Sequence, residues 1–146
     1  MDLIVRAVDV GLGNTKFVTA ATGGDIRCVS FPAVAYPSSD GQPSWPSGDR
    51  RKLMFIPIGA LFHEVGPEVA LAADTFRAKQ LHDEYTESPE YMALLRGALG
   101  MMKLSHIDLL VVGLPVALFA VKKAALERAM TGKHDVGDGK TVTVAS

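Results

Sequence analysis

Residues that can bind phosphate stand close together near the start of the chain. Asp9 ends an apolar run, glycines occupy positions 11 and 13, and Lys16 opens a second apolar segment. Two glycines two apart allow positive φ angles and leave the turn bare, so that its N–H groups can face one anion. Asp9 can hold a hydrated Mg²⁺ through its waters, and Lys16 can bring an ammonium to the same phosphates. The pattern predicts a nucleotide-phosphate site.

The segments on either side of these glycines indicate a hairpin. The run 3–8 reads as a strand, and the residues after Gly13 are β-branched and aromatic, which favours a second strand. The glycine motifs of P-loop and dinucleotide-binding proteins lead from a strand into a helix, and neither motif fits this sequence. The P-loop pattern is absent, and Lys16 replaces the last glycine of the dinucleotide pattern. A surface turn without a ligand is the competing interpretation.

The stretch from Asp9 to Lys16 resembles the first phosphate motif of the actin-like ATPase superfamily, Asp-x-Gly-x-Gly-x-x-Lys. Residues 107–116, with the turn Gly-Leu-Pro, resemble a strand and turn of the bacterial plasmid-segregation actin-like proteins of the ParM/StbA type. Residues 63–70 are similar to that group's Val-Gly segment, and residues 88–91 to its helix start. These four motifs follow the family's order and cover most of the chain.

This resemblance implies an α/β fold of the actin-like, ribonuclease H-like type. We expect a mixed sheet with an antiparallel three-stranded start, helices packed on the sheet, and a small inserted subdomain. Residues 1–146 would form the N-terminal domain, with a core of 1–36 and 104–146 and a rim subdomain of about 37–103. The Asp-x-Gly-x-Gly pattern recurs at 135–139, where it reads as a hairpin turn, and no phosphate motif of the second domain is recognised. We therefore expect the second domain of the fold to be absent and the chain to be part of a longer one.

The resemblance also implies ATP and Mg²⁺ as cofactors and a function in plasmid segregation. The intact protein would polymerise and hydrolyse ATP, whereas this part alone would be inactive. Asp9 would hold the metal through water, Lys16 would meet the β- and γ-phosphates, and the glycine turn would hold the β-phosphate. The implied cofactor-binding residues are Asp9, Gly11, Leu12, Gly13, Asn14, Thr15 and Lys16; no catalytic base is assigned.

The composition and the net charge restrict which classes of partner the protein can have. With 146 residues, 48% hydrophobic and 21% charged, the chain can bury one core. A net charge of −1 argues against direct contact with nucleic acid, so DNA would be reached through an adaptor protein. The basic cluster 50–52 reads as a solvated loop flank. No export signal or membrane span is visible, so we expect a cytoplasmic protein with no membrane partner.

Periodicity predicts the remaining elements. Strands are expected at 26–31, 53–58, 61–65 and 141–144, with Pro57 favouring a sheet edge. Ser88 and Pro89 predict the start of an amphipathic helix, and a second helix should cover 116–131. The near-continuous apolar run 107–112 predicts a parallel strand buried on both faces. The faces assigned to the two helices are Tyr91, Leu94, Leu95, Ala98, Leu99 and Met102 for the first, and Leu118, Val121, Ala125 and Ala129 for the second.

Other residues that could do chemistry receive structural interpretations. The single Cys28 lies in a predicted strand and is expected to be a buried thiol in a reducing compartment. The four histidines are not at metal-ligand spacings. The acidic residues at 83–90 suit a solvated face before a helix, and the glycines at 137 and 139 suit a hairpin turn. Trp45, in an irregular Pro- and Ser-rich stretch, is either a local anchor or a subunit contact.

Three other functions remain open. A small-molecule kinase of the same superfamily is one, since related Asp-x-Gly turns occur in pantothenate kinases. A non-enzymatic interaction module, which binds a partner without nucleotide, is the second. The third is an actin-like scaffold of cell division or cell shape, which would normally carry a membrane-binding amphipathic tail.

Overall fold

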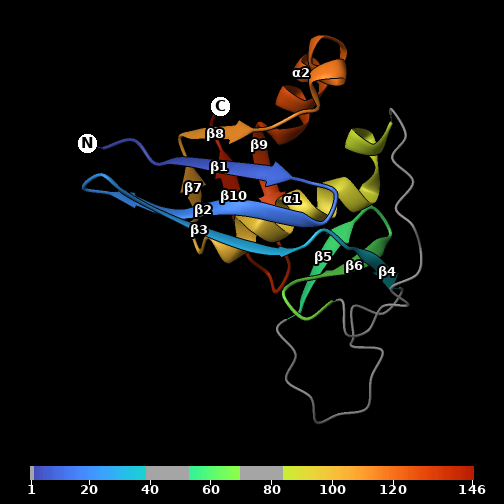
Figure 1. Cartoon of the computed structure of the whole chain (residues 1–146). Coiled ribbons are helices and arrows are strands. Elements are labelled where there is room, and N and C mark those ends of the chain that lie inside the picture. The colour runs from blue at the N-terminus through green and yellow to red at the C-terminus, as the bar shows by residue number, and fades with distance from the viewer. Residues whose placement is uncertain (1, 39–52, 70–83) are drawn as a thin grey trace.

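The computed structural model describes residues 2–38, 53–69 and 84–146, and Figure 1 shows their arrangement. The helices are the 3-10 helix η2 (Tyr85–Glu87), α1 (Pro89–Met101) and α2 (Val116–Met130). The strands are β1 (Val5–Val10), β2 (Asn14–Thr22), β3 (Asp25–Pro32), β4 (Tyr36–Ser38), β5 (Met54–Ile58), β6 (Leu61–Val65), β7 (His106–Ile107), β8 (Leu109–Val112), β9 (Gly132–Asp135) and β10 (Thr141–Val144).

The strands of the described residues form three sheets. The largest has the order β3-β2-β1-β8, in which β1, β2 and β3 are antiparallel neighbours and β8 is parallel to β1. The other two have the orders β7-β10-β9 and β4-β6-β5. The antiparallel three-stranded start, the parallel strand after a helix and the mixed α/β fold are therefore confirmed.

Helix α1 begins where the sequence predicted. The Ser88 hydroxyl accepts a hydrogen bond from the Tyr91 N–H at 3.2 Å and so caps the helix, and Pro89 occupies its first turn. The predicted face is buried along its length, from Tyr91 at 2% exposure to Met102 at 6%. This helix is confirmed in both its start and its orientation.

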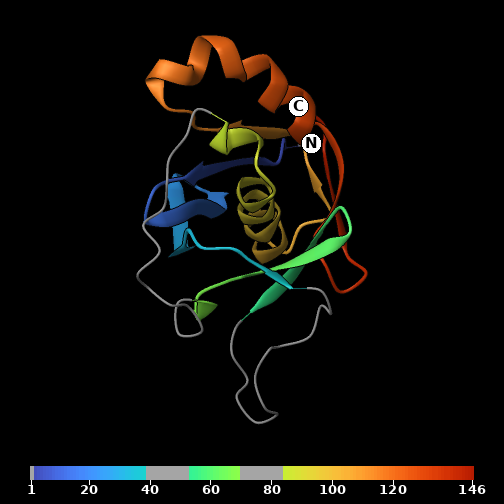
Figure 2. The ribbon, with the colours of Figure 1, turned by 90° about the vertical axis from the view of Figure 1, so that its right-hand side faces the viewer.

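The core surrounds α1. Figure 2 shows this helix in the centre, with β1–β3 on one side, β5 and β6 beneath, β9 and β10 on the other side and α2 above. The helix contacts β1, β2, β5, β6 and β10. Its buried side chains meet Val8 and Phe17 from the large sheet, Ile56 and Val65 from the β5–β6 hairpin, and Val142 from β10. One helix thus holds all three sheets together.

Two predicted hairpins are confirmed. Strands β5 and β6 pair across the turn at Gly59, and β5 lies at an edge of its sheet, where Pro57 costs no ladder hydrogen bond. Strands β9 and β10 pair across residues 136–140, and the Val136 N–H donates to the Lys140 carbonyl oxygen at 3.0 Å. The glycines at 137 and 139 have positive φ angles, as the hairpin interpretation requires.

The expected strand 107–112 is divided and is not buried on both faces. Asp108 interrupts it, because its carboxylate accepts hydrogen bonds from the Ile4 N–H at 2.7 Å and His106 Nε2 at 3.0 Å. Residues before Asp108 pair with β10, whereas residues after it pair with β1. Val111 is 53% exposed, since among the described residues nothing covers that face of the large sheet.

The packing face predicted for α2 is also wrong in part. The helix ends at Met130, close to the expected residue, but Val121 is 72% exposed and Ala129 is exposed as well. The buried residues are Leu126 and Met130. They lie on the strip of the helix that faces β8, because α2 rests on the edge of the sheet instead of spanning a full sheet face (Figure 1).

Cys28 is exposed, so the prediction of a buried thiol is wrong. It lies in β3, an edge strand whose residues 25–30 are all exposed. Cys28 pairs with Val18 and lies on the same sheet face as Lys16, opposite to the face that α1 covers. The sequence pattern does not indicate which face of the strand is covered.

Several sequence features lie outside the described residues. These are Trp45, the basic cluster 50–52, His82 and Asp83. In the described parts of the chain, no helix is both long and apolar enough to span a membrane.

The buried His134 should make stability depend on pH. Its Nε2 donates to the Met130 carbonyl oxygen at 2.7 Å, and its Nδ1 has no hydrogen-bond partner among the described residues. Burial lowers the pKa of His134 from 6.5, and the nearby Arg96 acts in the same direction, against the bond to Met130. The unfolded chain therefore binds more protons below pH 6.5, and the free energy of unfolding should fall as the pH drops from 6.5.

Urea unfolding at pH 7.5, 6.5 and 5.5 measures this dependence, with His134→Gln as the comparison because glutamine keeps an N–H for Met130. The variant should lose less stability on acidification than the wild type. A residual loss is expected from His63, whose pKa is also lowered by burial. Identical pH profiles for the two proteins would contradict the assignment to His134.

Candidate nucleotide-phosphate site

The β1–β2 hairpin brings the predicted residues together. Its turn lies at Leu12 and Gly13, and Asp9 and Lys16 face each other across the two strands. Side chains directly opposite in an antiparallel pair lie about 5 Å apart at Cβ. Both side chains are exposed and project from the same face of the large sheet, opposite to the buried Val8 and Phe17.

The two glycines of this turn have different roles, and neither has a positive φ angle. The expectation that they supply left-handed backbone is therefore wrong. A Cβ on Gly11 would lie 2.9 Å from the Asn14 carbonyl oxygen, which already accepts a hydrogen bond from the Gly11 N–H at 2.9 Å. A Cβ on Gly13 would meet nothing within 4 Å. The fold needs a glycine at position 11, and at position 13 it leaves open space above the turn.

Gly113 completes the site from the neighbouring parallel strand. It follows β8, and its N–H donates to the Val8 carbonyl oxygen at 3.3 Å. A Cβ at this position would lie 3.0 Å from Oδ1 of Asp9, so the Asp9 carboxylate rests against the bare Gly113 backbone. The carboxyl ends of the parallel strands β1 and β8 thus meet at the sheet edge where α/β proteins commonly bind ligands.

Tyr91 reaches the same place from helix α1. Its hydroxyl donates to the Gly113 carbonyl oxygen at 3.5 Å, a long contact, and its ring meets the Tyr85 ring edge-on at 5.5 Å. Burial raises the pKa of Tyr91 to about 12, and the charges of Tyr85 and Asp9 act in the same direction. The hydroxyl is therefore protonated at neutral pH and can donate.

An open cavity of about 260 Å³ adjoins the site on the exposed face of the sheet. Asp9, Lys16 and Gly113 line one end, and the rest of its wall is apolar apart from the Cys28 thiol. The lining residues are Ala7, Val8, Asp9, Lys16, Phe17, Val18, Cys28, Val111 and Gly113. The charged groups therefore stand at the mouth of an otherwise apolar hollow.

Most residues of the site, but not all, could be predicted from the sequence. Asp9, the turn residues and Lys16 lie together, and Leu12 is 62% exposed at the tip. The side chain of Thr15 does not join them, because it is fully buried on the core side of β2. Sequence reasoning missed the roles of Tyr91 and Gly113. The position of Gly113 could have been predicted, because it follows a strand that was expected to be parallel. For Tyr91, the helical periodicity predicted only that the side chain is buried.

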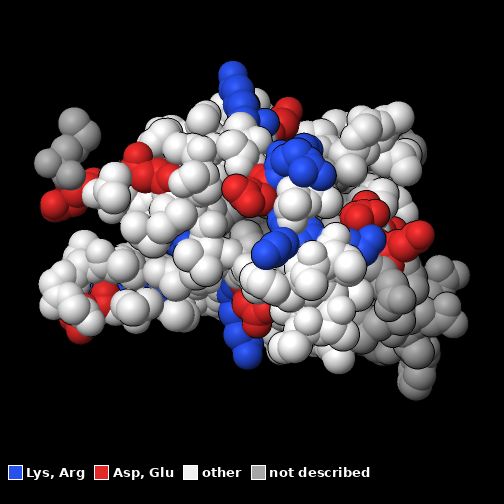
Figure 3. All heavy atoms as spheres, turned by 90° about the horizontal axis from the view of Figure 1, so that it is seen from above, with Lys and Arg blue, Asp and Glu red and all other residues white. Residues whose placement is uncertain are grey.

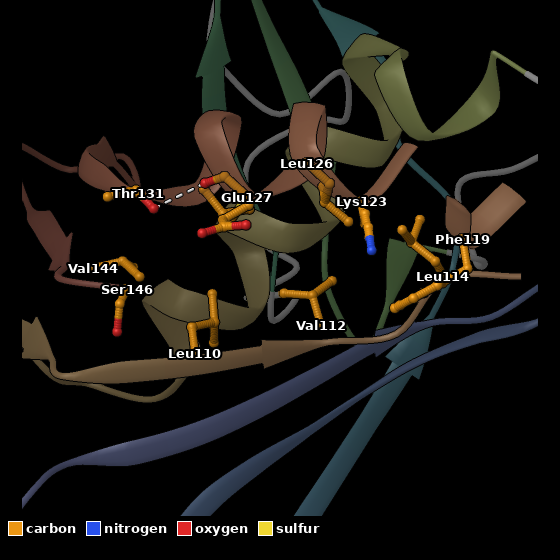
Figure 4. A pocket seen from close by; sticks show the side chains of 11 residues that line it. Leu110, Val112, Leu114, Phe119, Lys123, Leu126, Glu127, Thr131, Val144 and Ser146 are labelled. Carbon is orange, nitrogen blue, oxygen red and sulfur yellow. Dashed lines mark hydrogen bonds between the residues drawn. The ribbon is translucent and has the colours of Figure 1, made fainter. Parts of the chain in front are cut away.

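A second cavity, of about 150 Å³, lies between β8 and α2. Figure 4 shows Leu110, Val112 and Leu114 pointing from the strand side toward α2, with Lys123 and Glu127 on the helix. Its lining combines apolar residues with Lys123 and Glu127, and it includes neither Asp9 nor Lys16. Among the described residues, no group of three or more His, Cys, Asp or Glu side chains is placed to hold a metal directly.

The family comparison agrees with this geometry. A family model described as the N-terminal domain of actin-like proteins matches residues 7–146. The chain belongs to this family. The sequence prediction of the family is confirmed, and so is the fold class, because solved actin-like structures match the whole domain. No curated protein matches the sequence at a significant level.

Three solved structures illustrate the likeness of this actin-like domain. The apo ParM protein of pSK41 has 13% identity and a TM-score of 0.66, and covers 99% of this chain and 47% of its own. The AlfA filament from the Bacillus subtilis plasmid pLS32 has 16% identity and a TM-score of 0.68, over 98% and 54%. Bacillus thuringiensis ParM with AMPPNP has 14% identity and a TM-score of 0.59, over 99% and 44%.

The actin-like domain spans about half the length of these solved structures. In fold it resembles these ParM proteins and the AlfA filament.

The two glycines of the turn give a prediction about stability. Gly11→Ala should destabilise the domain by about 1–3 kcal/mol, because the new Cβ would be forced against a backbone oxygen. Gly13→Ala should be neutral or should stabilise by up to about 1 kcal/mol, since it reduces the freedom of the unfolded chain and meets no atom. Urea unfolding of both variants measures the difference, and equal losses would contradict the different roles of the two glycines.

Proposed function

We propose that this actin-like domain binds the phosphates of Mg²⁺-ATP at the β1–β2 turn, as part of a filament-forming protein that segregates plasmid DNA. The observation that carries the proposal is the open space above Gly13, flanked by Asp9 and Lys16 on one exposed face. A glycine that the fold does not need, between a carboxylate and an ammonium, suits the close approach of a phosphate.

The turn limits which backbone groups can take part. The Gly11 N–H already donates to Asn14, so the β-phosphate would be held by the N–H groups of Leu12, Gly13 and Asn14. Lys16 would neutralise the β- and γ-phosphates. Asp9 would orient the waters of the metal ion, which when bound neutralises charge on the phosphates. Thr15 would contribute through its backbone, because its side chain is buried.

The relatives support ATP and self-association. One solved relative was determined with AMPPNP and another as a filament, so the protein should bind ATP and should polymerise with copies of itself. On the face in Figure 3, Lys and Arg alternate with Asp and Glu over the described residues and form no continuous basic field. Together with the net charge of −1, this favours contact with DNA through an adaptor protein. The proposal places the protein in the cytoplasm.

ATP hydrolysis would need more than this domain. One wall of a cleft supplies part of the electrostatics and little of the water exclusion that phosphoryl transfer requires. The division into a core of 1–36 and 104–146 and a rim subdomain of about 37–103 belongs to the same proposal. We assign no catalytic base to this chain.

Lys16→Ala should weaken ATP binding about 10- to 100-fold, because it removes one charge-assisted hydrogen bond. Isothermal titration of Mg²⁺-ATP into the natural full-length protein measures the affinity. Arg27→Ala is the matched control, since Arg27 is an exposed cation in the same sheet, on β3. Its affinity should equal that of the wild type.

The outcomes separate the functions that the sequence left open. Unchanged affinity in Lys16→Ala would remove Lys16 from the site, and a wild type that binds no ATP would favour an interaction module without nucleotide. Filaments formed with AMPPNP, seen by electron microscopy, would favour a polymer. ATP binding without filaments, together with phosphorylation of a small molecule, would favour a kinase.

Gly13→Ala should weaken ATP binding by about tenfold or more, although the domain stays fully folded. The added Cβ would project into the space that the phosphate needs, where it meets no protein atom. The same titration measures this, with unfolding as the check on the fold. Wild-type affinity in this variant would place the phosphate elsewhere.

A further inference from the structure

Helix α1 touches the candidate site at one point. Tyr91 is 2% exposed and packs in the core against α1's neighbours, yet its hydroxyl lies 3.5 Å from the Gly113 carbonyl oxygen. The Gly113 backbone, in turn, lies close to Oδ1 of Asp9, because a Cβ on Gly113 would lie 3.0 Å from this oxygen, a tight contact. A direct line of contact therefore runs from the helix through Gly113 to the carboxylate.

We propose that Tyr91 is a positioning residue, which fixes the Gly113 turn and thereby holds the Asp9 carboxylate in place for metal-bound nucleotide. This inference rests on the proposed function, because it gives Asp9 the role of orienting a hydrated Mg²⁺. The Asp9 side chain is exposed on an open sheet face, and such a carboxylate loses rotamer freedom when it binds. A backbone surface that limits its rotamers before the metal arrives would reduce this loss.

The first turn of α1 is well placed for this task. The Ser88 hydroxyl donates to the Tyr85 carbonyl oxygen at 2.6 Å and accepts from the Tyr91 N–H at 3.2 Å. The edge-on contact of the Tyr85 and Tyr91 rings adds a second restraint. Tyr91 is therefore fixed at its backbone and at its ring before its hydroxyl meets Gly113.

The test is the Mg²⁺ dependence of ATP affinity in the natural full-length protein. Affinity is measured for the wild type and for Tyr91→Phe, once with saturating Mg²⁺ and once with EDTA. Phenylalanine keeps the packed ring and removes only the hydroxyl. We expect the gain in affinity that Mg²⁺ provides to shrink about 3- to 10-fold, whereas the affinity in EDTA stays unchanged.

Two further variants separate positioning from a general structural role. Tyr85→Phe removes the other hydroxyl of the same ring pair and should leave the Mg²⁺ gain unchanged. In an Asp9→Asn background, Tyr91→Phe should cause no additional loss, because its effect passes through the carboxylate. Gly113→Ala, which displaces Asp9 from the opposite side of the contact, should reduce the Mg²⁺ gain as well.

The failures are distinguishable. A wild type whose ATP affinity is independent of Mg²⁺ would overturn the role of Asp9 and with it this inference. A wild type with the expected Mg²⁺ gain and a Tyr91→Phe variant that keeps the whole gain would overturn the role of Tyr91 alone. Equal losses with Mg²⁺ and with EDTA would make Tyr91 a packing residue.

Discussion

The parallel pairing of β1 and β8 over helix α1 is the constraint on which the site depends. Strand β1 buries one face against α1, so Val8 points into the core and Asp9 must point out. The same register makes β1 and β8 end side by side, which puts Gly113 against Asp9. A slip of one residue in β1 would turn Asp9 into the core and would bring Val8 to the turn. Core packing thus fixes the orientation of the charged groups.

Features set by nearby residues could be predicted from the sequence. The Ser88 cap and the hairpins at Gly59 and at residues 136–140 depend on residues a few positions apart, and their types carry the signal. The family motif is equally local. Asp9 and Lys16 were recognisable as a pair because one short turn joins their strands.

Features set by distant partners could not be predicted in the same way. Cys28, Val111 and Val121 were all expected to be buried from their apolar character, and all three are exposed. Burial requires a covering element, and the sequence does not indicate which side of a strand or helix receives one. Gly113 and Tyr91 were not predicted as site residues, because their contact also depends on distant parts of the chain. They are 22 positions apart in the sequence, and only the crossover from α1 to β8 brings them together.

The contrast between Gly11 and Gly13 shows what a fold can and cannot explain about a motif. Gly11 is required by the hairpin itself, since any larger residue would meet the Asn14 carbonyl oxygen. That requirement would exist in a turn with no ligand, so Gly11 says nothing about function. At position 13 a Cβ would meet no atom within 4 Å, and the backbone has no positive φ angle, so the fold itself does not require a glycine there. A glycine at this position also costs backbone entropy on folding. A glycine that lowers stability and is not required by the fold is best explained by a ligand that must approach its backbone closely. Between Asp9 and Lys16, a phosphate has the matching charge and size.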